Sequence, residues 1–158
     1  MARVAQYFGI DIANGAVIGI VGGGGAARST ARTWQKLGGK VLNLGGKRDL
    51  DNYDWFESQI TGEKQCDVLI NFDDDTTPNE VNVAGFVMNA NYEIVDAEHL
   101  DRVSAINDQV VDGRWLLSAQ HLECWRQLWA PHAENLLPSL DLLVTMLVTA
   151  ESVLASYS

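Results

Sequence analysis

A run of four glycines, residues 22–25, stands between a short apolar segment and an alanine-rich helical pattern. The apolar segment Val17–Val21 is typical of a buried strand. The spacing Gly22-x-Gly24-x-x-Ala27 matches the G-x-G-x-x-G/A pattern of dinucleotide-binding folds. In that pattern the first glycine permits a tight turn, and the second lets a pyrophosphate approach the backbone. The N-terminus of the following helix offers N–H groups and a partial positive charge to the anion.

A glycine-rich turn that binds nothing is the alternative interpretation of this stretch. The pattern after the loop favours nucleotide binding, because small and apolar residues recur there at helical spacing while charged and polar residues take the other face. The recurring residues are Ala26, Ala27, Thr30, Ala31, Trp34 and Leu37. The predicted pyrophosphate site consists of Gly22, Gly23, Gly24, Gly25, Ala26 and Ala27.

Composition and charge exclude several classes of partner. The chain has 158 residues, of which 47% are hydrophobic and 20% charged, with a formal net charge of −10. This surplus of negative charge argues against nucleic-acid and anionic-membrane partners. We expect a cytoplasmic protein, because the N-terminal stretch has no apolar signal segment. Cys66 and Cys124 are predicted to be buried thiols rather than a disulfide or a metal pair.

Strand and helix patterns alternate along the chain. Further strands are expected at Lys40–Leu44, Asp67–Phe72, Val83–Met88 and Gln109–Gly113. Helices are expected at Asp51–Ile60, from Asp96 onward, at Trp115–Trp129 and at Asn135–Tyr157. Such alternation predicts an α/β fold of the Rossmann-like three-layer type, with a parallel sheet of four or five strands, helices on both faces and additional C-terminal helices. We expect residues 1–158 to form a single NAD(P)-binding domain.

The residues after the second strand bear on the choice of cofactor. In NAD-binding sites an acidic residue about 20 residues after the first glycines binds the ribose hydroxyls. Here Asn43, Leu44 and Gly45 occupy that region, and the cations Lys47 and Arg48 follow. Two cations would suit a 2′-phosphate, so NADP is favoured over NAD. The alternative, that both are solvent-exposed loop charges, remains open.

Three consecutive carboxylates, Asp73–Asp75, follow the third strand at the sheet edge where ligands bind in such folds. Adjacent carboxylates converge poorly on one ion, and the sequence offers no second ligand cluster. We therefore predict a solvated acidic loop and no metal site. Negative charge at this place would weaken a bound dinucleotide.

Four segments, in order, resemble the C-terminal, NADP-binding domain of the shikimate dehydrogenase family, between residues 8 and 129. The segment Gly22–Arg28 resembles the family's GAGGAAR loop, and Asp67–Asn71 its D-x-L-I-N strand. Asn89–Tyr92 has the spacing of its D-x-x-Y segment, with asparagine for aspartate. Val111–Gln120 resembles its V-x-G-x-x-M-L-x-x-Q run, with leucine for methionine.

The chain also departs from the family pattern. Gly45–Lys47 replaces the N-R-T that holds the 2′-phosphate, and Phe72–Asp75 replaces a short threonine or serine plus proline segment. The family's substrate domain, with its catalytic lysine and aspartate, is absent, so no residue here receives a catalytic role. The chain is either an excised domain of a longer dehydrogenase, as its abrupt start suggests, or a free-standing degenerate relative, as the altered motifs suggest.

The resemblance implies an oxidoreductase that passes a hydride between NADP(H) and 3-dehydroshikimate or shikimate. It places Asn71 and Gly113 near the nicotinamide half of the cofactor and gives Gln120 and Tyr92 contacts with the substrate. The alternatives are a surface amide for Gln120 and a core or rim aromatic for Tyr92. The competing function is a catalytically inactive, nucleotide-binding or regulatory module. Shikimate, quinate and other substrates are not distinguished.

The C-terminal stretch is a long apolar helical pattern. Asp141 and Glu151 interrupt it, so it is not a membrane span. Its apolar residues would lose cover without the family's substrate domain, and exposed apolar patches find partners. We therefore expect a homo-oligomer formed through this helix, by Leu136, Leu137, Leu140, Leu143, Val144, Leu147 and Leu154.

Overall fold

The computed structural model describes residues 1–48, 50, 65–73, 81–90, 109–129, 132 and 134–157. The chain forms two compact units, Met1–Asp112 and Gly113–Ser158. The single domain expected for residues 1–158 stays a prediction. The helices expected at Asp51–Ile60 and from Asp96 lie outside the described residues.

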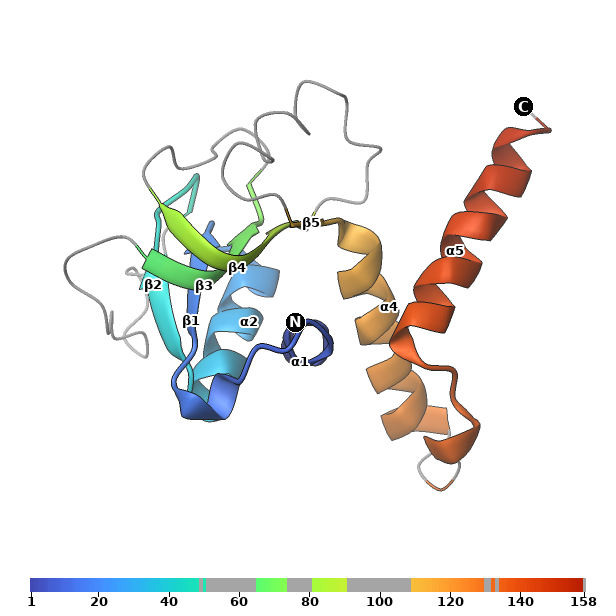
Figure 1. Ribbon diagram of the computed structural model, residues 1–158, viewed down its shortest axis with the longest axis horizontal. Helices are drawn as coiled ribbons and strands as arrows, with labels where there is room; N and C mark the ends of the chain where they lie inside the picture. The colour runs from blue at the N-terminus through green and yellow to red at the C-terminus, as the bar shows by residue number, and fades with distance from the viewer. Residues whose placement is uncertain are drawn as a thin grey trace. The chain divides into compact units, whose positions relative to one another are not determined.

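The N-terminal unit is built on a five-stranded parallel sheet in the order β2-β1-β3-β4-β5 (Figure 1). The strands are β1 Val17–Val21, β2 Lys40–Asn43, β3 Gln65–Asn71, β4 Asn82–Asn89 and β5 Val110–Val111. The helical elements of this unit are α1 Ala2–Tyr7, a 3-10 turn Ile12–Asn14 and α2 Gly25–Lys36. This parallel sheet with its helices confirms the predicted α/β, Rossmann-like fold class. Its strands are apolar runs buried on both faces, as is typical of parallel strands.

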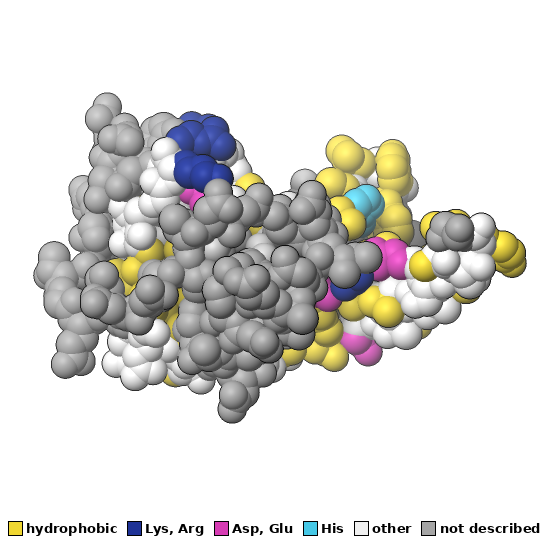
Figure 2. All heavy atoms as spheres, turned by 90° about the horizontal axis from the view of Figure 1, so that it is seen from above, with side chains coloured by type: hydrophobic (Ala, Val, Ile, Leu, Met, Phe, Trp, Pro, Cys, Tyr) yellow, Lys and Arg dark blue, Asp and Glu magenta, His cyan; other side chains and the backbone are white. Residues whose placement is uncertain are grey.

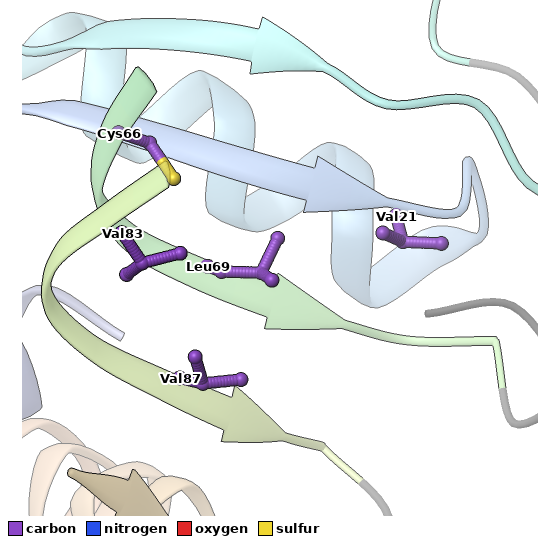
Figure 3. Close-up of a cluster of buried hydrophobic side chains, with 5 residues drawn as sticks. All are labelled: Val21, Cys66, Leu69, Val83 and Val87. Carbon is purple, nitrogen blue, oxygen red and sulfur yellow. The ribbon is translucent and has the colours of Figure 1, made fainter. Parts of the chain in front are cut away.

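Branched and sulfur-containing side chains from three neighbouring strands form one buried cluster of the core. Figure 3 shows them on β1, β3 and β4: Val21, Cys66, Leu69, Val83 and Val87. The register of β3 against β4 shifts between Cys66 and Val68. From Cys66 to Val68 the chain advances two residues in β3 and three in β4, from Val83 to Phe86, so β4 carries one extra residue there.

Helix α2 buries the face that its sequence predicts, with two exceptions. Ala27, Thr30, Ala31 and Trp34 are buried, whereas Ala26 and Leu37 are exposed because they lie at the two ends of the helix. The Trp34 indole N–H donates to the Ala16 carbonyl over 2.8 Å.

Asp67, the aspartate of the D-x-L-I-N segment, has a structural role. Its carboxylate accepts the backbone N–H of Val17 over 2.7 Å. The bond satisfies the first donor of β1 and joins the start of that strand to β3.

The C-terminal unit contains α4 Gly113–Cys124, a π-helical turn Trp125–Trp129, a 3-10 turn Glu134–Leu136 and α5 Leu140–Ala155. The expected continuous helix Asn135–Tyr157 is wrong in its first turn. Pro138 lacks an N–H and disfavours helical geometry in the residue before it, so α5 begins only after the N-cap Ser139. None of the helices in the described part of the chain combines the length and apolarity needed to cross a bilayer.

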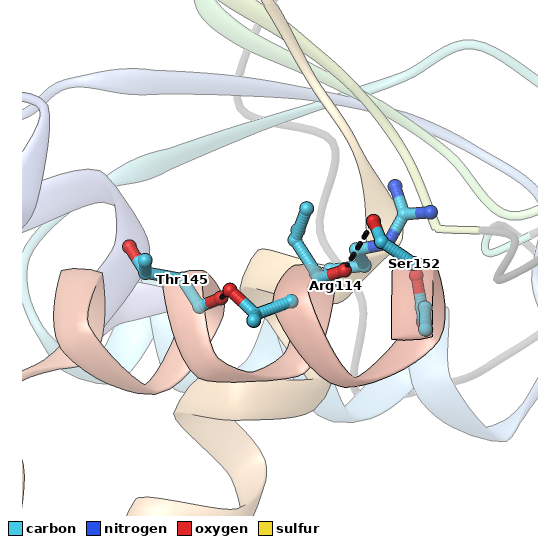
Figure 4. A network of polar contacts seen from close by, with 6 residues as sticks. Arg114, Thr145 and Ser152 are labelled. Atoms are coloured by element: carbon cyan, nitrogen blue, oxygen red, sulfur yellow. Dashed lines mark hydrogen bonds and ion pairs between the residues drawn. The ribbon is translucent and has the colours of Figure 1, made fainter. Parts of the chain in front are cut away.

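Helices α4 and α5 pack together within this unit. Leu140 and Val144 are the buried residues of α5, and the Arg114 Nε donates to Glu151 Oε2 over 2.7 Å (Figure 4). Hydroxyl groups along α5 donate to carbonyls one turn earlier in the same helix, as Thr145 does to Asp141. Their polar atoms are therefore satisfied inside the helix.

The two cysteines differ in burial. The expectation of a buried thiol is confirmed for Cys66 and wrong for Cys124, which is exposed at the last residue of α4. Burial raises the pKa of the Cys66 thiol to about 12. At pH 8 a thiol with that pKa is only roughly 10⁻⁴ ionised, and the thiolate is the reactive form.

We expect a thiol reagent such as iodoacetamide to modify the folded chain at Cys124 alone at pH 8, with Cys66 reacting only in denaturant. Mass spectrometry of the labelled peptides reads out both rates. Equal rates at the two positions in the folded chain would contradict the burial of Cys66.

Candidate functional site

Three loops follow the adjacent strands β2, β1 and β3 and meet at one edge of the sheet. They are Gly22–Gly24 after β1, Leu44–Arg48 after β2 and Phe72–Asp73 after β3, and together we call them the strand-end cluster. Successive parallel strands end at the same edge, and β1 lies where the strand order reverses. In open α/β sheets this switch point is where ligands bind.

The glycine loop has the geometry that its sequence predicts. Gly22 has φ +104°, which favours glycine, and its N–H donates to the Gly45 carbonyl over 2.6 Å. Helix α2 then starts with Gly24 as N-cap, and no side chain of the described residues caps it. Gly25 and Ala26 are exposed, and Ala27 is fully buried, as expected for a small residue that brings the helix close to the sheet.

The cations predicted to meet a phosphate lie in the loop after β2. Lys47 and Arg48 are both exposed. The Arg48 guanidinium lies against the glycine loop, because its Nη2 is 3.0 Å from the point where a Cβ on Gly24 would stand. A side chain at Gly24 would displace that cation, whereas glycine leaves the guanidinium beside the open end of α2. The strand-end cluster thus combines backbone donors with a positive charge.

Asp73 is the first of the three carboxylates that the sequence places at this edge, and its contact with the loop after β2 is what sequence reasoning missed. Its Oδ2 accepts the backbone N–H of Lys47 over 2.6 Å, and its own N–H donates to Asn71 Oδ1 over 2.8 Å. Its Oδ1 is 3.1 Å from the point where a Cβ on Gly22 would stand. Asp73 is half-buried, and the expectation of a solvated acidic loop stays a prediction. Asp74 and Asp75 lie outside the described residues.

Gly46 shows why the loop after β2 differs from the N-R-T of the family that the sequence resembles. It has φ +134°, and a Cβ there would lie 2.5 Å from Asp73 Oδ2 and 2.7 Å from the Gly22 nitrogen. The larger middle residue of N-R-T would collide at this place in the observed backbone. The paired glycines after β2 and the aspartate after β3 therefore depend on each other, and the two differences from that pattern belong together.

The remaining predicted residues divide between the two units. Asn71 is buried at the end of β3, in register with the buried Asn89 at the end of β4. Gly113 is the buried first residue of α4 in the C-terminal unit, and Gln120 is exposed on the same helix. Tyr92 lies outside the described residues. Contacts of Asn71 and Gly113 with a nicotinamide, and of Gln120 and Tyr92 with a substrate, stay predictions.

The described residues contain no group of three His, Cys, Asp or Glu side chains that could hold a metal ion. The described residues of the strand-end cluster offer backbone N–H groups, the Asp73 carboxylate and the cations Lys47 and Arg48.

The substitution Gly46→Ala tests the packing between the loops after β1 and β2. We expect it to lower the free energy of unfolding by about 1–3 kcal/mol, because the new Cβ overlaps backbone and a carboxylate that is itself hydrogen-bonded. Gly45→Ala is the matched control, since Gly45 also has positive φ (+76°) but no atom within 4 Å of its would-be Cβ. Urea unfolding measures both, and an equal cost for the two variants would contradict the packing described here.

Comparison with known proteins gives matches among solved structures only. No protein-family model matches the chain, and no curated protein matches it. The shikimate 5-dehydrogenase of Thermus thermophilus, in complex with NADP(H) and shikimate, superposes with a TM-score of 0.67 at 19% identity, over 91% of this chain and 58% of that one. Shikimate dehydrogenase 1 of Peptoclostridium difficile gives 0.56 at 16% identity, over 92% and 59%.

A further shikimate dehydrogenase, in complex with NADP⁺, matches with a TM-score of 0.53 at 17% identity, over 94% of this chain and 58% of that one. The chain thus spans less than three fifths of the length of these neighbours. At such identities the likeness concerns the fold. The chain has the Rossmann-like α/β fold found in these shikimate dehydrogenase structures.

Proposed function

We propose that this chain is the NADP-binding part of a shikimate dehydrogenase-like oxidoreductase. The observation that carries the proposal is the position of the Arg48 guanidinium against Gly24, beside the open N-terminus of α2. It joins a cation to the backbone donors of a glycine loop at the switch point of the sheet. The fold likeness to dehydrogenase structures that contain NADP(H) supports the same conclusion.

In this proposal the loop and the helix bind the cofactor by its phosphates. The pyrophosphate lies at the first turn of α2, where the N–H groups of Gly25, Ala26 and Ala27 have no acceptor within the helix. Lys47 and Arg48 neutralise the 2′-phosphate of the adenosine half. Asn71, at the end of β3 on the same sheet edge, is proposed to contact the nicotinamide half.

The proposed reaction transfers a hydride between NADP(H) and 3-dehydroshikimate or shikimate. When bound, the cofactor supplies the hydride chemistry, and this chain holds and orients it. We propose that the group that moves the proton is supplied by another domain. Gln120 and Tyr92 are proposed to contact the substrate hydroxyls, and one of the neighbours contains shikimate itself.

Calorimetric titration with NADP⁺ and NAD⁺ at low salt tests the cofactor proposal. We expect Arg48→Ala to weaken NADP⁺ binding about ten-fold or more, because a charge-assisted contact to phosphate is lost. Lys47→Ala should have a smaller effect of the same sign. Lys40→Ala is the matched control: it removes the same charge from an exposed side chain at the opposite end of β2, and we expect no change.

Absence of binding of either dinucleotide at millimolar concentration would overturn the cofactor proposal. The glycine loop would then be architecture without a ligand, and a non-enzymatic module would be the better account. An equal loss in Arg48→Ala and Lys40→Ala would show a general effect of net charge.

We also propose that the chain self-associates through α5. Leu140 and Val144, two of the residues expected in this contact, are buried within the chain, so that part of the expectation is wrong. The exposed apolar stripe of α5 consists instead of Leu142, Met146 and Val153, each about half exposed or more and at helical spacing, with Thr149 between them. The Thr149 hydroxyl donates to the Thr145 carbonyl, so its hydrogen-bond donor is satisfied within the helix. Apolar side chains are prominent over this unit in Figure 2.

A second copy of the chain suits this stripe, because the helix carries little charge to repel its own copy. Asp141 and Glu151 are its charged residues, and Glu151 is paired with Arg114. An apolar stripe that stays in water is costly, and pairing two such stripes removes both from it.

Light scattering coupled to size-exclusion chromatography tests the self-association. We expect the parent chain to elute with the mass of an oligomer and Met146→Glu to shift it toward the monomer, because a charge on the stripe cannot be buried without a partner. Thr33→Glu, on an exposed position of α2, is the control and should leave the mass unchanged. A monomeric parent chain at several hundred micromolar would contradict the proposal.

A further inference from the structure

Asp73 brings a carboxylate from β3 to the loop after β2. Its Oδ2 is hydrogen-bonded to the Lys47 N–H, and Gly46 has no room for a side chain between Asp73 and Gly22. The carboxylate therefore lies against Gly22, while the Arg48 guanidinium lies against Gly24, two residues further along the same loop. Opposite charges thus flank one short glycine turn.

These two charges favour different dinucleotides. In Rossmann sites an acidic residue near the end of the second strand accepts hydrogen bonds from the ribose hydroxyls of NAD, whereas an arginine there accommodates the 2′-phosphate of NADP. The segment that ends β2, Asn43–Gly45, contains no acidic residue. Asp73 nevertheless places a carboxylate there, because it reaches the β2 loop from the end of β3, on the other side of β1.

Asp73 opposes a 2′-phosphate in two ways. Its charge repels the phosphate dianion, and the repulsion is weakly screened at this range. It also occupies the backbone N–H of Lys47, which is the kind of donor that loops offer to anions. Its second oxygen, and the remaining lone pairs of the first, can still accept hydrogen bonds from neutral hydroxyl groups.

We propose that Asp73 is the specificity-determining residue of the cofactor site, which offsets the attraction of Lys47 and Arg48 for the 2′-phosphate and so lets the chain accept NAD as well as NADP. This inference rests on the proposed function, because it assigns the discrimination between two ligands of the same site. It differs from a purely positioning role, in which Asp73 would only hold the loops and would affect both dinucleotides alike.

Two uncharged variants separate these roles. Asp73→Asn removes the charge and keeps an oxygen that can accept the Lys47 N–H. Asp73→Ala removes both. We expect Asp73→Asn to tighten NADP⁺ binding about ten-fold while NAD⁺ affinity is unchanged or weaker, and we expect this change in the ratio of the two dissociation constants to shrink at about 0.5 M salt. Asp73→Ala should shift the ratio in the same direction, even where a loosened loop weakens both ligands.

Calorimetric titration of NADP⁺ and NAD⁺ into the full chain and the two variants provides the ratios, and thermal unfolding confirms that each variant folds. An unchanged ratio of the two dissociation constants in Asp73→Asn, or an equal loss of both affinities in Asp73→Ala that leaves the ratio unchanged, would overturn the inference and leave a positioning role. If the parent chain and both variants bind neither dinucleotide, the proposed cofactor site and this inference both fail. If the parent chain binds both dinucleotides and the ratio shifts toward NADP⁺ in both variants, the inference is supported. If NADP⁺ binds only once the charge is removed, the parent chain does not accept both dinucleotides and the inference fails.

Discussion

The candidate site depends on one close approach between two stretches of backbone. The Gly22 N–H donates to the Gly45 carbonyl, and this brings the loop after β2 against the loop after β1 with no space for a side chain at Gly46. Parallel strands make such a contact natural, because their carboxyl ends stand side by side. The same approach positions Arg48 over Gly24 and Asp73 over Gly22. The positions of the two charged side chains, Asp73 and Arg48, thus depend on this backbone contact rather than on an ion pair.

Sequence reasoning succeeded where the determining interactions are local. The glycine loop, the face of α2 buried by Ala31 and Trp34, and the strands themselves can be predicted from spacing and apolar runs over a few residues. It failed where a partner lies far along the chain: the hydrogen bond between Asp73 and Lys47 joins residues 26 positions apart. An aspartate two residues after a strand-ending asparagine, together with paired glycines after the previous strand, was the available signal. The adjacency of this aspartate to two further carboxylates favoured a solvated loop instead.

The fold says less about the choice of cofactor than the side chains of the candidate site do. The likeness to the dehydrogenase structures extends over nine tenths of this chain, but at 19% identity or less it concerns the course of the backbone. Cofactor choice depends on the few side chains that the strand-end cluster holds, and these differ from the pattern that the sequence otherwise resembles. The proposal of an NADP site therefore rests on Arg48 and the open end of α2, with the neighbours as support.

The tight contact among Gly22, Gly46 and Asp73 also constrains how this chain can diverge. A side chain introduced at position 46 collides with Asp73 and with the Gly22 backbone, so it is tolerated only after the loops have separated. Removing Asp73 first frees the space of its carboxylate but leaves the backbone of Gly22 in the way. The three positions consequently behave as an epistatic set, in which the effect of each substitution depends on the residues at the other two. An arginine at position 46 would therefore require the loops after β1 and β2 to move apart first.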